Sequence, residues 1–84
     1  MKEKKECEMC GRYEYLERHH LIFGRGLRDL ADQYDLTINI CRSCHSKIHK
    51  DKDLMRWSKE KGQKMFERQR SRKEFKEVFG KSYL

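Results

Sequence analysis

The sequence predicts a small α+β domain that zinc holds together, with two strands and a helix at its core and a basic helical extension after them. The first observation is the composition: of 84 residues, 42% are charged and 36% are hydrophobic, so the hydrophobic core must be thin. The second is the cysteines, which form two Cys-x-x-Cys pairs, Cys7 with Cys10 and Cys41 with Cys44, and so supply four ligands for a tetrahedral zinc. The third is the order of strand-like and helix-like segments around these pairs. Metal binding would then supply part of the folding free energy.

The N-terminal part begins with a charged stretch, residues 1–6, that we expect to fray. The first cysteine pair follows as a metal-binding knuckle, in which Gly11 supplies the permissive backbone that such a turn needs. Residues 13–22 combine aromatic and aliphatic side chains without a breaker, which predicts the first strand.

A loop at residues 24–26 leads to the second half of the core. Residues 27–34 can hold a short helical turn, and residues 36–40 alternate apolar and polar side chains, which predicts the second strand. The second cysteine pair then opens a helix, with Ser43 as its expected N-cap and Lys50 as its last residue.

Residues 51–84 have a helical composition, and their apolar side chains recur at helical spacing. We expect weak points or breaks at Gly62 and Ser71 and a stop at Gly80. The expected organisation is a single domain in which residues 1–50 form the core and residues 51–84 pack on it as a basic helical extension.

The net charge of +7 is unevenly distributed along the chain. Residues 1–49 carry nine Lys and Arg against eight Asp and Glu, whereas residues 50–84 carry twelve against six. A basic half beside a metal-rich half indicates a polyanionic partner, most simply nucleic acid. For the tail alone, the alternative is a solvated helix face.

The sequence also bears on the compartment. No apolar run is long enough to span a bilayer, and the charged start is not a signal peptide, so we expect no membrane partner and a cytoplasmic location. In that reducing compartment, paired Cys-x-x-Cys motifs bind metal more often than they form disulfides. The sequence leaves open whether the protein is a monomer or a homodimer.

Four histidines remain after the thiols have completed a zinc shell. His19 and His20 are adjacent, and adjacent residues on a strand point to opposite faces, so one can ligate an ion while the other faces the substrate as a base. His45 and His49 are one helical turn apart and can join the ligating histidine. Three protein ligands with open positions are typical of a catalytic metal site. The alternative is that the adjacent pair lies on the surface and the helix histidines substitute as zinc ligands.

Taken in order, these residues resemble a known family. The motif consists of Cys7-x-x-Cys10, the run from Arg18 to Gly24, the run from Tyr34 to Cys41, Cys44-His45 and His49. It resembles the HNH endonucleases of the ββα-metal fold, in the branch with four zinc-binding cysteines, and is similar to the small phage-type members. The resemblance covers roughly residues 7–50. It implies a metal-dependent endonuclease that hydrolyses DNA phosphodiester bonds and nicks one strand per site.

The resemblance implies a role for each histidine. His20 corresponds to the catalytic general base that activates the attacking water. His19, His45 and His49 correspond to ligands of the catalytic divalent ion. The four cysteines correspond to the ligands of a structural Zn²⁺.

In this family an Asn orients the base. Asn39 is the only Asn of the chain and is the candidate for that catalytic role, although it lies six residues before His45, closer than the usual pattern. Asp35, Gln33 or a backbone carbonyl are the alternatives for orienting His20.

The ion and the nucleic-acid contacts follow from general chemistry. Imidazole-rich ligation favours Mn²⁺, Ni²⁺, Co²⁺ or Zn²⁺ on affinity, whereas cellular supply and family habit favour Mg²⁺ or Mn²⁺. Arg25 and Arg28, in the loop, and Lys47 and Lys50, on the predicted histidine helix, are the candidates to bind DNA phosphates. Nothing resembles a base-reading helix, so we expect weak sequence preference. The alternative functions are a non-catalytic zinc-knuckle module that binds nucleic acid and an RNA-directed nuclease on the same scaffold.

Overall fold

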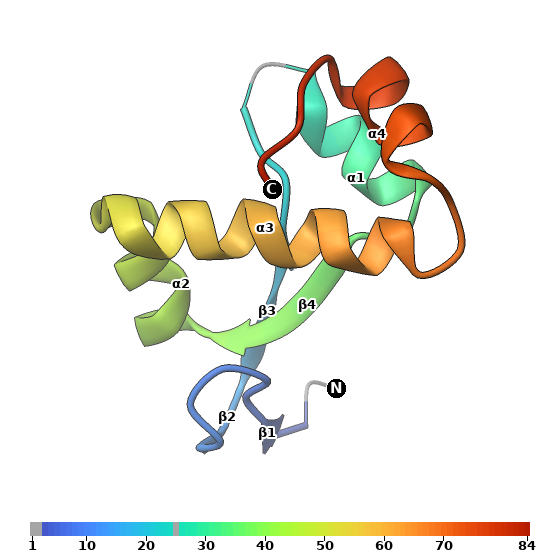
Figure 1. The fold of residues 1–84 in the computed structure, drawn as a ribbon. Coiled ribbons are helices and arrows are strands. Elements are labelled where there is room, and N and C mark those ends of the chain that lie inside the picture. Colours follow the sequence, from blue (N-terminus) through green and yellow to red (C-terminus); the bar gives the residue numbers. More distant parts are fainter. Residues whose placement is uncertain (1–2, 25) are drawn as a thin grey trace.

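The computed structural model describes residues 3–24 and 26–84 and has the α+β fold that the sequence predicts. Its elements are, in chain order, β1 (Lys5–Glu6), β2 (Tyr13–Glu14), β3 (Leu16–His20), α1 (Leu27–Gln33), β4 (Thr37–Cys41), α2 (Arg42–Lys50), α3 (Lys52–Glu67) and α4 (Arg72–Phe79). Within the described residues, the strands form two small antiparallel sheets. α1 and α2 pack against the larger of the two, and α3 and α4 pack on these helices (Figure 1).

The larger sheet is the hairpin of β3 and β4. The two strands pair from Leu16 opposite Cys41 to His20 opposite Thr37. α2 begins at the residue after β4 and packs against both strands. This arrangement of two strands and one helix places the second cysteine pair at one end of the hairpin and the adjacent histidines at the other.

The first predicted strand is divided into two. Tyr13 and Glu14 pair with Glu6 and Lys5, so part of the N-terminal stretch that we expected to fray is ordered as β1. After Tyr15 the chain changes its partner from β1 to β4. Sequence pattern alone does not reveal this change, because both segments have strand-forming residues.

The strand also ends earlier than predicted, at His20 instead of Ile22. Leu21 and Ile22 are both fully buried. Consecutive side chains on a strand point to opposite faces, so two neighbours can both enter the core only where the chain leaves the strand.

Two hydrophobic clusters form the core. The first joins the hairpin to α2 and consists of Cys7, Leu21, Ile38, Ile40, Cys41, Cys44 and Ile48. The second joins the chain after β3 to α1, α3 and α4 and consists of Ile22, Ala31, Leu36, Phe66, Phe75 and Phe79. Leu21 and Ile22 therefore send one side chain each into a different cluster, and Met65 of α3 packs against both.

α3 runs across the molecule between α2 on one side and the pair of α1 and α4 on the other (Figure 1). The break expected at Gly62 does not occur, because α3 continues through it to Glu67. A Cβ at Gly62 would lie 2.8 Å from Ile22 Cγ1 and 3.0 Å from Leu21 Cβ. This glycine is therefore needed for close approach of two backbones and does not interrupt the helix.

The helix ends agree with the sequence at two places and differ at one. Ser71 accepts a hydrogen bond from the Glu74 backbone N–H and caps α4, which ends at Gly80. Cys41, and not Ser43, occupies the N-cap position of α2, and its side chain makes no capping hydrogen bond, because the helix begins directly at the second cysteine pair. None of the described helices is both long enough and apolar enough to cross a membrane.

Candidate active site

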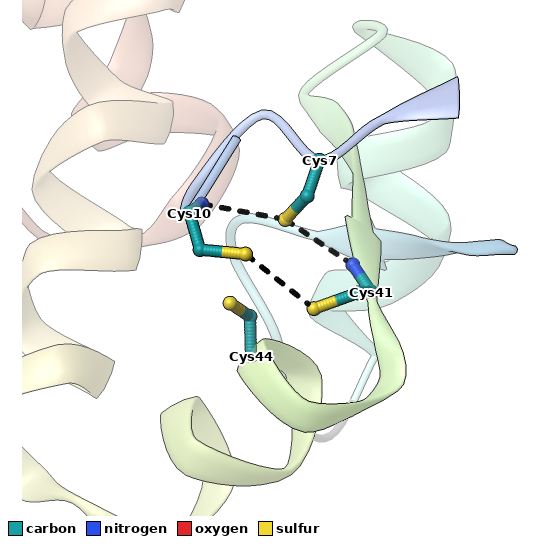
Figure 2. A group of neighbouring side chains, drawn as sticks. All are labelled: Cys7, Cys10, Cys41 and Cys44. Atoms are coloured by element: carbon teal, nitrogen blue, oxygen red, sulfur yellow. Dashed lines mark hydrogen bonds between the residues drawn. The ribbon is translucent and has the colours of Figure 1, made fainter. Parts of the chain in front are cut away.

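The four cysteines gather where the first knuckle meets the start of α2 (Figure 2). Their sulfur atoms all lie within 4.8 Å of one another, and Cys10 Sγ lies 3.8 Å from Cys41 Sγ. A tetrahedral site with Zn–S bonds of about 2.3 Å has sulfur–sulfur edges of about 3.8 Å. Gly11 has a φ of 80°, which lets the chain turn out of the knuckle as the sequence predicts. The cluster is thus compatible with one structural zinc.

The backbone around the first cysteine pair stabilises the thiolate form of Cys7. Cys7 Sγ accepts hydrogen bonds from the backbone N–H groups of Met9 and Cys10 at 3.4 Å and of Cys41 at 3.3 Å. Burial alone would raise the pKa of Cys7, but these amides outweigh it and lower the pKa to about 6. Burial, reinforced by hydrogen bonds to the other thiols, raises the pKa of Cys44 to about 12. A divalent cation among the four sulfurs offsets this cost, since it favours the thiolate form of each ligand.

A second cluster consists of three histidines. His19 comes from β3 and is buried, whereas His45 and His49 come from successive turns of α2. Their candidate ligand atoms lie within 4.8 Å of one another. The ring centroid of His19 lies 5.1 Å from the ring centroid of His45 and 5.6 Å from that of His49. The donor set is the imidazole set that suits a transition-metal ion.

Hydrogen bonds hold the rings of two of these histidines. His45 Nδ1 lies 2.9 Å from Glu17 Oε1, and a carboxylate can only accept, so His45 donates from Nδ1. That leaves His45 Nε2 with its lone pair. His19 Nε2 lies 2.8 Å from Ser58 Oγ of α3. Contacts of this kind fix the ring orientation of metal-binding histidines in proteins.

The surroundings of His19 and His49 favour the neutral forms of these two rings. Burial, followed by the nearby His45, His49 and His20, lowers the pKa of His19 from its usual 6.5 to about 4. Burial, followed by His45 and Arg28, also lowers the pKa of His49. Metal ligation requires a neutral imidazole, so both rings have the protonation state of a ligand at neutral pH.

His20 is the last residue of β3 and has a different hydrogen-bond partner from His19. Its Nε2 lies 2.9 Å from Asp32 Oδ1 of α1, and the same oxygen accepts from Arg18 Nη2 at 3.0 Å. Because the carboxylate accepts, His20 donates from Nε2 and keeps the lone pair on Nδ1. An imidazole held in this way can take a proton.

Asp32 is a residue that our sequence reasoning missed. The sequence does show an acidic residue at this position, within the helical turn predicted over residues 27–34. It does not show where that turn lies relative to β3, so the contact with His20 could not be predicted. In the described structure Asp32, and not Asp35 or Gln33, is hydrogen-bonded to His20. Asn39 lies opposite Arg18 in the hairpin, exposed on β4, and its backbone N–H donates to Glu8 Oε2.

One cleft of about 420 Å³ joins these groups. It is lined by Arg18, His19, His20, Phe23, Gly24, Arg28, His45 and His49. All four histidines therefore border the same space, together with two guanidinium groups that can bind phosphate. Lys47 and Lys50 instead line a separate depression of about 490 Å³ with Ser43, Ser46, Asp51 and Leu54. Arg25 lies outside the described residues.

Comparison with known proteins gives the family. A family model described as HNH endonuclease matches residues 7–51, which is more than half of the chain. The match begins at the first residue of the four-cysteine cluster and includes all four histidines of the cleft. No curated protein and no solved structure matches the chain. The chain belongs to the HNH endonuclease family, and its four neighbouring cysteines fit the zinc-binding branch.

Proposed function

We propose that this protein is a metal-dependent endonuclease that hydrolyses phosphodiester bonds of DNA. Membership of the HNH family indicates nuclease activity in general. The observation that carries the more specific proposal is the shared cleft. The cleft is lined both by the three-histidine cluster and by His20, which is hydrogen-bonded to Asp32.

The positions of the side chains indicate which residues would bind metal and which would act as the base. His19, His45 and His49 would hold the catalytic ion, and the four cysteines would hold the structural zinc. A divalent ion bound by the histidines supplies stabilisation of the negative charge that develops on the phosphate and on the leaving 3′ oxygen.

His20 acts as the general base in this proposal. Its Nδ1 takes a proton from the water that attacks the phosphorus in line. Asp32 receives the Nε2–H hydrogen bond, which holds the ring in one tautomer and stabilises the imidazolium as it forms. We assign to Asp32 the orienting role for which Asn39 is the candidate by family resemblance.

The substrate contacts follow from the charges around the cleft. Arg28 lines it beside the histidines and can bind a phosphate next to the scissile one. Lys47 and Lys50 lie in the separate depression, so their contribution would be a general attraction to the backbone that weakens with salt. One such cleft per chain cuts one strand at a time, with weak sequence preference.

The direct test is relaxation of supercoiled plasmid by the purified protein. We expect nicked circles on addition of Mn²⁺ or Mg²⁺, with Ni²⁺, Co²⁺ and Zn²⁺ tested in parallel, and no product in EDTA. Salt-sensitive DNA binding without cleavage in any of these ions would instead indicate a zinc-knuckle binding module. Single-stranded RNA, offered at equal nucleotide concentration, distinguishes a DNA nuclease from an RNA nuclease.

A further inference from the structure

Ser58 is a buried hydroxyl that lies outside the segment matched by the family model. It belongs to α3, seven residues after the end of the match, and its exposed fraction is 0%. Its Oγ lies 2.8 Å from His19 Nε2 and 2.7 Å from the Leu21 backbone oxygen. The helical extension therefore contacts the ring of one histidine of the metal cluster directly.

The direction of these two hydrogen bonds is fixed by chemistry. A backbone oxygen only accepts, so the single proton of the Ser58 hydroxyl goes to Leu21. Ser58 Oγ then has only lone pairs to offer His19, whose Nε2 must donate. A neutral imidazole has one N–H, so Nδ1 of His19 keeps the lone pair.

The packing of α3 makes this contact possible. Ser58 and Gly62 are four residues apart and lie on the same face of the helix. The missing side chain at Gly62 lets that face approach Leu21 and Ile22, which directly follow the adjacent histidines. The hydroxyl thus comes within hydrogen-bond distance of the Leu21 backbone oxygen, directly after the end of β3.

A hydroxyl also suits this position better than a carboxylate. His45, which is partly exposed, is held by the carboxylate of Glu17. An ionised group in the place of Ser58 would pay a large desolvation cost, because the site is fully buried. A hydroxyl that passes its own proton to a backbone oxygen fixes the ring with no buried charge.

We propose that Ser58 is a positioning residue that fixes His19 as the Nε2–H tautomer and so presents Nδ1 as the ion-binding nitrogen. The proposal rests on the proposed function of His19 as a ligand. Under this proposal α3 orients a ligand of the metal site in addition to packing in the hydrophobic core.

The test uses the full chain and has two readouts other than cleavage. Long-range ¹H–¹⁵N correlation spectra of the imidazoles report the tautomer of each histidine, and we expect the Nε2–H form for His19 in the wild type at pH 7. In Ser58→Ala we expect a mixture of tautomers. We also expect Mn²⁺, titrated by the EPR signal of the free ion, to bind about 10- to 100-fold more weakly. Ser58→Thr keeps the hydroxyl and should restore both readouts.

Ser46→Ala is the matched control, since it removes an exposed hydroxyl from the helix that carries His45 and His49. It should leave tautomer and Mn²⁺ affinity unchanged. An Nδ1–H tautomer for His19 in the wild type would overturn the proposal even if no Ser58 variant folds. A folded Ser58→Ala variant that keeps the wild-type tautomer of His19 and the wild-type affinity for Mn²⁺ would also overturn the proposal. Failure of the wild type to cleave DNA would contradict the proposed function and leave the tautomer result standing.

Discussion

The adjacent histidines have different surroundings because their rings are hydrogen-bonded to side chains of different helices. His19 is buried against α2 and α3, where Ser58 holds its ring. His20 faces α1, where Asp32 holds its ring. Two neighbouring residues of one type thus acquire different hydrogen-bond partners and border one cleft from two sides.

The orienting residue can be tested by comparing two variants. Asp32→Asn keeps the size of the side chain but removes the charge that stabilises a protonated His20. We expect the nicking rate to fall by about 100-fold, within the range of general acid–base contributions. Asn39→Ala, the matched control, should cleave at nearly the wild-type rate, since its side chain is exposed on β4. A large loss of nicking rate in Asn39→Ala, with no loss in Asp32→Asn, would indicate that Asn39 and not Asp32 orients His20.

The lowered pKa of His19 has a consequence for stability. The unfolded chain takes up a proton on this residue near pH 6.5, but the folded chain does so only near pH 4. Between these values the unfolded state binds more protons, so the free energy of unfolding falls as the pH falls; above pH 6.5 the effect is absent.

His19→Asn removes this titration. Urea unfolding without added divalent ion should show the wild-type stability declining relative to the variant by about 1 kcal/mol from pH 6.5 to pH 5.5. Parallel pH dependence of the two proteins would contradict the lowered pKa.

At the scale of elements, the decisive contact is that of α3 with the chain leaving β3. Gly62→Ala would place a Cβ 2.8 Å from Ile22 Cγ1. Alanine gains about 1 kcal/mol of helix propensity over glycine, but overpacking a buried contact costs about 1–3 kcal/mol. We expect the steric cost to prevail, because the added Cβ would also lie 3.0 Å from Leu21 Cβ, an atom next to the backbone that cannot move away easily.

Urea unfolding measures this prediction, with Lys64→Ala as a control on an exposed position of the same helix. The control should be near neutral. A Gly62→Ala variant that is more stable than the wild type would mean that α3 can move away from Leu21 and Ile22 at little cost.

The elements were predictable to different degrees for physical reasons. The pairing of two strands with the histidine helix follows from residue periodicity, and that part of the prediction is confirmed. The division of the first strand at Tyr15 and the continuity of α3 through Gly62 depend on which elements meet in space. Local pattern holds no information on such contacts. The partners Asp32 and Ser58 were not predicted for the same reason, since each comes from another helix.

At the scale of the whole molecule, the four-cysteine cluster is continuous with the hydrophobic core. Three of the four cysteines belong to the first hydrophobic cluster. A zinc ion bound by these sulfurs would add its binding free energy to the folding free energy of the chain. We therefore expect folding of the hairpin and α2 to depend on zinc.

Metal removal tests this dependence. The purified protein should contain one tightly bound zinc per chain by elemental analysis, and Cys10→Ser should lower that occupancy and the melting temperature together. Removal of zinc with a strong chelator should collapse the dispersion of amide signals in the hairpin and α2, since structural zinc supplies folding free energy outright. An unchanged spectrum after complete zinc removal would contradict the structural role.

His20 is the proposed base of a metal-dependent nuclease and belongs neither to the four-cysteine cluster nor to the three-histidine cluster. The most direct measurement is the rate of plasmid nicking by wild type and His20→Ala in saturating Mn²⁺, with zinc content and Mn²⁺ affinity determined on the same samples. We predict that His20→Ala loses at least about 100-fold in rate while both metal-binding readouts stay at the wild-type level. Equal nicking by the two proteins, or loss of Mn²⁺ binding in His20→Ala, would contradict the claim.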